Sequence, residues 1–147
     1  MEKLLDPHVV SQIREAFAAL QQPVQMLFFG SQEDCELCET TRQLLEELAA
    51  THELVSLASY DLQADRALAE RYQVDRAPGL VIAARDGDQV LDFGIRFSGI
   101  PSGHEFSTLI SDILMVSKRD SGLGAATRAY LKGLARPLLL QVFVTPT

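Results

Sequence analysis

The fold is decided by the stretch Phe28-Phe29-Gly30-Ser31-Gln32-Glu33-Asp34-Cys35-Glu36-Leu37-Cys38, in which an apolar run ends in a turn and both cysteines of the chain follow. The apolar residues predict a buried strand, and Gly30 begins the turn that ends it. Asp34 is predicted to be the N-cap of a helix that begins with the cysteines. A C-x-x-C motif between a strand and a helix is typical of a redox-active dithiol.

The predicted position of the two cysteines assigns them different roles. A cysteine in the first turn of a helix faces unpaired backbone N–H groups and the positive end of the helix dipole, which favour the thiolate. We therefore expect Cys35 to be the nucleophile. Cys38, one turn further along, is expected to pack against the strand layer and to resolve the mixed disulfide intramolecularly.

Two other interpretations of the cysteine pair are weaker. Tetrahedral zinc needs two further ligands, and the three histidines (His8, His52 and His104) show no ligand spacing with one another. A structural disulfide is disfavoured because a two-residue loop restricts the unfolded chain only slightly. The sequence thus predicts a dithiol that works without a metal or another cofactor.

Composition limits the partners of the chain. Its 147 residues are 47% hydrophobic, which suits one domain of ordinary size or one domain plus an appendage, and its net charge is −7 with no run of Lys or Arg. Nucleic acids and anionic membranes are therefore poor partners. No basic segment precedes an apolar core at the N-terminus, and no apolar stretch reaches membrane-spanning length, which favours a cytoplasmic location. There a lone cysteine pair is more often catalytic or redox-sensing than structural.

Apolar periodicity predicts alternating helices and strands. Helices are expected over 7–20 (with Asp6 as its N-cap), 35–50, 64–72 and 104–116, and strands over 24–29, 54–60, from Pro78 onward, and over 89–97. The order strand, helix, strand implies a parallel right-handed crossover. A turn at 85–88 then makes the last strand antiparallel.

This order is that of the thioredoxin fold, an α/β fold with a mixed sheet and helices on both faces. More narrowly, the chain resembles the N-terminal unit of the glutaredoxin-like protein disulfide oxidoreductases, which contain two tandem thioredoxin-fold units, each with a C-x-x-C. The matching stretches are Cys35–Cys38 (CELC), Val74–Pro78 (VDRAP), Asp92–Pro101 (DFGIRFSGIP) and Met115–Arg119 (MVSKR). The resemblance implies that Cys35 and Cys38 form the redox-active disulfide.

The resemblance also implies a cis-proline at Pro78, 43 residues beyond Cys35. Proline is tolerated at the start of an edge strand for purely structural reasons. The functional interpretation is a cis peptide between Ala77 and Pro78 in a loop that faces the dithiol. There the backbone of Ala77 would pair with an extended segment of a substrate.

An internal repeat predicts how the chain is divided. Residues 14–31 align with residues 128–145 at an offset of 114 residues. We expect a thioredoxin-fold domain over 1–120, a linker over 121–124, and in 125–147 the opening helix and strand of an incomplete second unit, which stops just before a second C-x-x-C is due. The apolar strand 138–144 lacks its own sheet, so a symmetric homodimer that buries this tail is expected.

The surroundings of the dithiol depart from those of thioredoxins. The chain has no tryptophan, and Asp34 and Phe29 stand where thioredoxins have a tryptophan and a buried aspartate, so the proton acceptor for Cys38 is not identified. The carboxylates of Glu33, Asp34, Glu36 and Glu39 oppose the helix-terminus effect on the Cys35 thiolate. They disfavour the anionic thiol glutathione and favour a protein partner with basic residues.

Three functions follow from these observations. The first is a thiol–disulfide oxidoreductase in cell redox homeostasis that acts on protein disulfides and is served by an upstream reductase. The second is an electron-transfer module between a flavin reductase and a peroxidase, similar to the tandem N-terminal portion of the flavoprotein reductase that serves peroxiredoxins. The third is a docking unit with weak redox activity.

Overall fold

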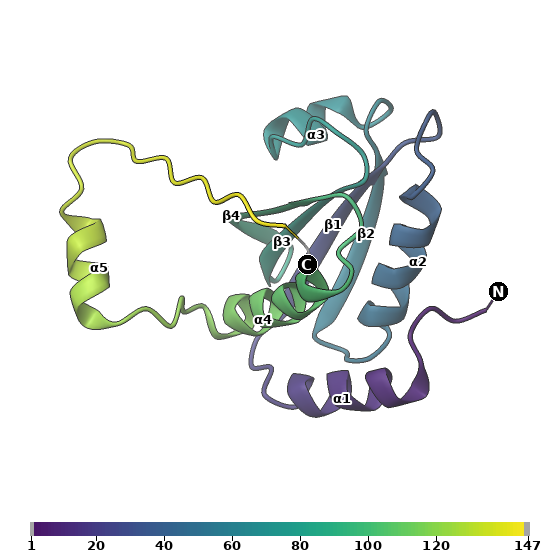
Figure 1. Ribbon diagram of the computed structural model, residues 1–147, viewed down its shortest axis with the longest axis horizontal. Coiled ribbons are helices and arrows are strands. Elements are labelled where there is room, and N and C mark those ends of the chain that lie inside the picture. Colours follow the sequence, from purple (N-terminus) through teal and green to yellow (C-terminus); the bar gives the residue numbers. More distant parts are fainter. Residues whose placement is uncertain (1, 146–147) are drawn as a thin grey trace.

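A computed structural model describes residues 2–145 of the chain. The elements, in chain order, are α1 (Pro7–Phe17), β1 (Val24–Gly30), α2 (Cys38–Ala49), β2 (Val55–Asp61), α3 (Arg66–Arg71), β3 (Gly79–Asp86), β4 (Gln89–Ser98), α4 (His104–Lys118) and α5 (Ala125–Lys132). The four strands form one sheet in the order β2-β1-β3-β4 (Figure 1). β1 and β2 are parallel, and β3 is antiparallel to both β1 and β4. The mixed sheet confirms the predicted α/β class.

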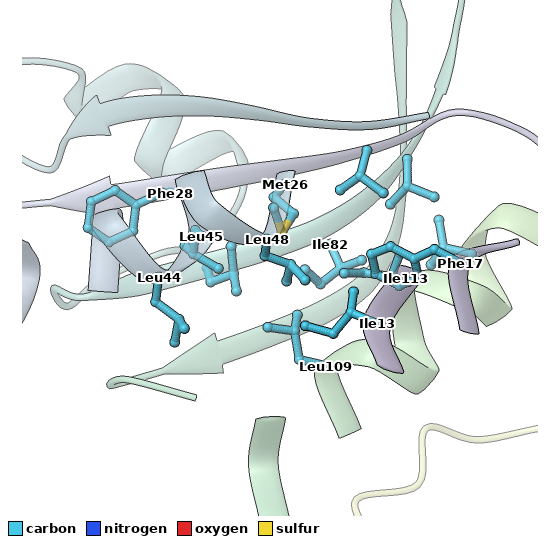
Figure 2. Packing of buried hydrophobic residues seen from close by; sticks show 14 of the residues in the cluster. Ile13, Phe17, Met26, Phe28, Leu44, Leu45, Leu48, Ile82, Leu109 and Ile113 are labelled. Atoms are coloured by element: carbon cyan, nitrogen blue, oxygen red, sulfur yellow. The ribbon is translucent and has the colours of Figure 1, made fainter. Parts of the chain in front are cut away.

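Helices cover both faces of this sheet. On one face, α1, α2 and α4 pack on β1 and β3 in a large apolar cluster, much of which is drawn in Figure 2. On the other face, α3 packs on the same two strands in a smaller cluster. Consecutive residues of β1 belong to different clusters, Phe28 to the first and Phe29 to the second. A strand buried on both faces needs a near-continuous apolar run, and the apolar run over 24–29 is what predicts this strand from the sequence.

The helix boundaries follow local hydrogen bonding. Asp6 is the predicted N-cap of α1, and its carboxylate accepts the N–H groups of His8 and Val9 at 2.7 and 3.2 Å. The helix ends at Phe17, three residues before the predicted end, because the N–H of Leu20 turns back to the carbonyl of Phe17 in a tighter turn. α4 instead continues two residues beyond its predicted end.

The tail differs from its prediction. α5 ends at Lys132, and none of its side chains is buried. The expected strand 138–144 is wrong for the chain on its own, since it pairs with no strand among the residues described. Its apolar side chains are 60–89% exposed. In Figure 1, α5 lies to one side of the layered unit. In the described part of the chain, the helices are too short or too polar to cross a lipid bilayer.

Candidate redox site

The two cysteines form a disulfide at the N-terminus of α2, with Cα atoms 5.4 Å apart. The predicted helix start was wrong, because α2 begins at Cys38 rather than at Cys35. The N–H of Cys38 donates to the carbonyl of Cys35 at 3.3 Å, so the C-x-x-C segment is a tight turn that leads into the helix. Asp34 is not the N-cap: Leu37 takes that place without a side-chain hydrogen bond, and Asp34 has φ 49°. Aspartate is among the residues that tolerate this left-handed conformation.

The two cysteine residues differ in their exposure to solvent. Cys38 is only 8% exposed and lies in the large apolar cluster, as predicted. Its Sγ accepts the N–H of Ser31 at 3.4 Å. A Cβ at Gly30 would crowd the Phe28 ring, 3.1 Å from Cε1 and 3.2 Å from Cζ, whereas it would only be in ordinary contact with Cys38 Sγ at 3.8 Å. Cys35 is half-buried, so it is the sulfur that a second molecule reaches more easily.

A hollow of about 500 Å³ opens beside the disulfide. Its lining residues include the two cysteines, Arg42 from α2, Phe28 from β1 and Tyr60 from β2. It lies at the C-terminal end of the two parallel strands, next to Ser31 and Gln32 after β1 and to the last residues of β2. Two parallel strands bring their carboxyl ends to the same edge of the sheet. Binding sites of open α/β sheets are found at that edge.

The charge around the disulfide is less uniformly acidic than the sequence suggests. Glu33, Asp34 and Glu36 are exposed on the loop before α2. Glu39, however, forms an ion pair with Arg42, which also pairs with Glu46. The hydrogen bond from Arg42 to Glu39 is the largest cause of the raised pKa of Arg42. Sequence reasoning missed Arg42, although its spacing of four residues from Cys38 places both on one helix face.

The structure places Ala77 and Pro78 at the same end of the sheet as the cysteines. Their peptide bond is cis. β1 and β3 pair Phe29 with Gly79, so the preceding residue, Pro78, comes beside Gly30 at the start of the cysteine loop. Ala77 packs against the same apolar cluster as Cys35. The four residues singled out in the sequence thus gather at one end of the β1–β3 pair.

Phe29 cannot accept a proton from Cys38, although it stands where thioredoxins have a buried aspartate. This side chain is fully buried on the opposite face of the sheet, where its ring stacks on Tyr60 at 5.3 Å between centroids. Phenylalanine carries no titratable group, so this position provides packing only. Within residues 2–145, no three His, Cys, Asp or Glu side chains are grouped in a way that could hold a metal ion.

Comparisons with known proteins agree with this geometry. No family model matches the chain. It is 25% identical over 131 residues to the alkyl hydroperoxide reductase protein AhpF of Pseudomonas aeruginosa, and 26% identical over 144 residues to AhpF of Staphylococcus epidermidis. These alignments cover 89% and 98% of the chain, but only 22% and 25% of the two relatives.

Two solved structures show the likeness in three dimensions. A protein disulfide oxidoreductase from Aeropyrum pernix superimposes with a TM-score of 0.75 at 29% identity, over 90% of this chain and 57% of the other. AhpF from Enterococcus faecalis superimposes with a TM-score of 0.78 at 26% identity, over 90% and 62%. The chain is therefore a thioredoxin-fold unit similar to those of protein disulfide oxidoreductases and of the N-terminal domain of AhpF.

Proposed function

We propose that the chain is a thiol–disulfide oxidoreductase that acts on protein disulfides through the Cys35–Cys38 couple. The observation that carries this proposal is the difference in exposure between the two cysteines, which line the same hollow: Cys38 is 8% exposed and lies in the large apolar cluster, whereas Cys35 is half-buried. This asymmetry suits an attacking and a resolving cysteine. The likeness to a protein disulfide oxidoreductase supports the same chemistry.

The reaction is two successive thiol–disulfide exchanges. The Cys35 thiolate attacks one sulfur of the substrate disulfide, so that a Cys35–substrate bond forms, the substrate S–S bond breaks, and the released sulfur leaves as a thiolate that takes up a proton. Cys38 then loses its proton and attacks Cys35 Sγ, which forms the Cys35–Cys38 bond and releases the second substrate thiol. Two electrons pass to the substrate, and an external dithiol or an upstream reductase returns them.

The proposed substrate contact is the backbone of Ala77, which precedes Pro78 in the loop beside Gly30. An extended segment that carries the substrate disulfide would pair with this backbone while its sulfur meets Cys35. The exposed carboxylates of Glu33, Asp34 and Glu36 favour a partner with basic residues near its disulfide. We therefore expect glutathione to reduce the Cys35–Cys38 disulfide more slowly than dithiothreitol at equal thiol concentration. Equal rates for the two reductants would contradict this preference.

Insulin reduction tests the main proposal. With dithiothreitol as reductant, the wild-type chain is expected to accelerate insulin precipitation, and Cys35→Ser is expected to fall to the rate without enzyme. Cys38→Ser is expected to accumulate a mixed disulfide with insulin, visible as an added mass that dithiothreitol removes. A Cys35→Ser variant as active as the wild type would refute the proposal. A wild type no faster than dithiothreitol alone would leave the docking unit as the better description.

A relay role is the second candidate, and the two AhpF relatives favour it. In this role the dithiol would pass electrons between an upstream reductase and a peroxidase. It predicts rapid reduction of Cys35–Cys38 by a flavin reductase and little activity on insulin. A cytoplasmic location, where such thiol systems keep dithiols reduced, is part of both proposals.

We also propose that residues 1–120 form the redox domain, that 121–124 are a linker, and that 125–147 begin a second unit and mediate a homodimer. Support comes from the exposed apolar residues of this tail, among them Tyr130, Leu139 and Phe143. Light scattering on the purified chain is expected to give the mass of a dimer, and Phe143→Asp the mass of a monomer. A monomeric wild type at micromolar concentration would refute the homodimer.

A further inference from the structure

We propose that Arg96 is a positioning residue for the substrate-binding loop, and that it holds the backbone of Ala77 in place for a protein substrate. The proposal rests on the function proposed above. The loop in question, residues 73–78, connects α3 to β3 and ends in Ala77 and Pro78. Val74 packs against the smaller apolar cluster, but Asp75 and Arg76 after it have side chains 80% and 70% exposed, so the position of this part depends on what holds the two ends of the loop.

Arg96 contacts the first end of this loop. Its Nε donates a hydrogen bond to the carbonyl of Tyr72 at 2.8 Å. Tyr72 is the C-cap of α3 and directly precedes the loop. A helix leaves its last carbonyl groups without intrahelical partners, so a guanidinium is well placed to satisfy one. The Arg96 guanidinium also lies 6.0 Å from the centre of the Tyr72 ring.

The other side of the guanidinium is fixed by Asp92. Nη1 and Nη2 of Arg96 donate to Oδ1 and Oδ2 of Asp92 at 2.8 and 2.7 Å, a bidentate ion pair whose side chains are only 24% and 31% exposed. The hydrogen bond from Arg96 is the first cause of the lowered pKa of Asp92. A planar guanidinium makes both sets of contacts at once, which a lysine ammonium does not.

Backbone irregularity brings Asp92 and Arg96 together. In a regular strand, residues four apart are separated by about 13 Å. In β4, however, Ile95 pairs with Ile82 and Asp92 with Ala83, so β4 carries two additional residues at this point. Gly94 adopts φ 85°, and its N–H donates to Oδ1 of Asp92 at 2.9 Å. This bulge shortens the strand and brings Asp92 to the Arg96 side chain.

The second end of the loop is held by the end of the same strand. The carbonyl of Pro78 accepts the N–H of Gly99 at 2.8 Å, directly after β4. Within the loop region, Gly79 packs closely, since a Cβ there would lie 2.8 Å from the carbonyl oxygen of Arg76. β4 therefore fixes both ends of the loop, one through the Arg96 side chain and one through the backbone. Loss of the Arg96 contacts loosens the Tyr72 end only, where the N–H of Val74 still donates to the carbonyl of Ala69 and the Tyr72 side chain stays buried.

The test compares a protein substrate with a small disulfide. Arg96→Gln is expected to raise KM for insulin about five- to tenfold, with kcat within about twofold, because it removes one charged hydrogen bond that positions the loop. Reduction of 5,5′-dithiobis(2-nitrobenzoic acid) by the reduced enzyme, which needs the thiolate but no backbone pairing, is expected to stay unchanged. Arg66→Gln is the matched control, because Arg66 forms an exposed ion pair with Glu70 on α3.

Hydrogen exchange provides a readout that does not need activity. Amides 73–77 are expected to exchange faster in Arg96→Gln, and at the wild-type rate in Arg66→Gln. Asp92→Asn, which keeps the side-chain size, is the second variant and is expected to shift both readouts in the same direction. An unchanged KM for insulin, wild-type exchange in the loop, or a parallel loss of both activities would each overturn the proposal. A wild type inactive on insulin would overturn the proposed function, while hydrogen exchange would still decide on Arg96.

Discussion

Ser117 is the buried polar side chain whose loss has the clearest expected effect on stability. It lies in the last turn of α4 and is fully buried. Its hydroxyl accepts the N–H groups of Gln21 and Gln22 at 2.8 and 3.0 Å and donates to the carbonyl of Gln22 at 2.9 Å. These three hydrogen bonds join α4 to the segment between α1 and β1, and so fix where the central strand begins.

The magnitude follows from what Ser117→Ala leaves behind. A hydrogen bond contributes about 0.5–1.5 kcal/mol net, and more when its loss leaves a buried donor unsatisfied. Gln21 and Gln22 are exposed residues, so water can partly replace the hydroxyl, which favours the lower part of this range. For three bonds we expect a loss of about 2 kcal/mol in the free energy of unfolding. In a chain of this size, that lowers the melting temperature by roughly 4–8 °C.

Urea denaturation followed by circular dichroism measures this loss. Ser111→Ala is the matched control, because Ser111 is an exposed serine in the same helix. The control is expected to match the wild type or to be slightly more stable, since alanine favours helix. If Ser117→Ala has the same free energy of unfolding as Ser111→Ala, the three hydrogen bonds do not stabilise the fold and the reasoning fails.

Three further substitutions test other contacts. Gly79→Ala places a Cβ 2.5 Å from Val74 Cγ1 and 2.8 Å from the Arg76 carbonyl oxygen. We expect it to lower the free energy of unfolding, measured by urea denaturation, by about 1–3 kcal/mol. Gly124→Ala, at a site with open space around it, is expected to leave the urea midpoint unchanged, and the same result for Gly79→Ala would contradict the close packing. Arg119→Ala removes hydrogen bonds to the carbonyls of Pro23 and Arg85, so it should lower the melting temperature more than Arg66→Ala does. Burial raises the pKa of Glu47, but hydrogen bonds from the N–H groups of Leu5 and Leu4 and from Gln43 outweigh it, so its pKa in the folded chain is lowered. The stabilisation is therefore present above the unfolded pKa and lost as the pH falls through the folded value. Thermal melts should show Glu47→Gln less stable than the wild type at pH 7 and equal to it in strong acid; a constant difference would disprove this linkage.

The parts of the fold that the sequence predicted are those that depend on neighbouring residues. The apolar run of β1, the N-cap of α1 at Asp6 and the hairpin after β3 are all set by local pattern. The C-x-x-C pair is local as well, so its place between β1 and α2 was predicted correctly. The error at Asp34 is of the same kind: aspartate favours both an N-cap and a left-handed turn, and only the backbone distinguishes them.

The contacts that the sequence did not reveal are between distant residues. Ser117 bonds to residues 95 and 96 positions away, so nothing near it in the chain indicates that its hydroxyl is buried. Arg96 meets Asp92 because of a bulge in β4, and a regular strand would keep the two apart. The spacing of Glu39, Arg42 and Glu46 along a helix indicates ion pairs between them, but the position of Arg42 beside the disulfide depends on how α2 packs. Each of these contacts requires the folded arrangement before it can be recognised.

The segment 138–144 shows why one pattern has two outcomes in the same chain. Its counterpart in the repeat, β1, has the same apolar character and lies between β2 and β3, which satisfy its backbone on both sides. Strand propensity mostly reflects packing against such neighbours rather than an intrinsic backbone preference. Residues 138–144 pair with no strand among those described, and their side chains stay exposed. The same apolar pattern is therefore a strand where neighbouring strands pair with it, as in β1, and irregular where no strand does, as in residues 138–144.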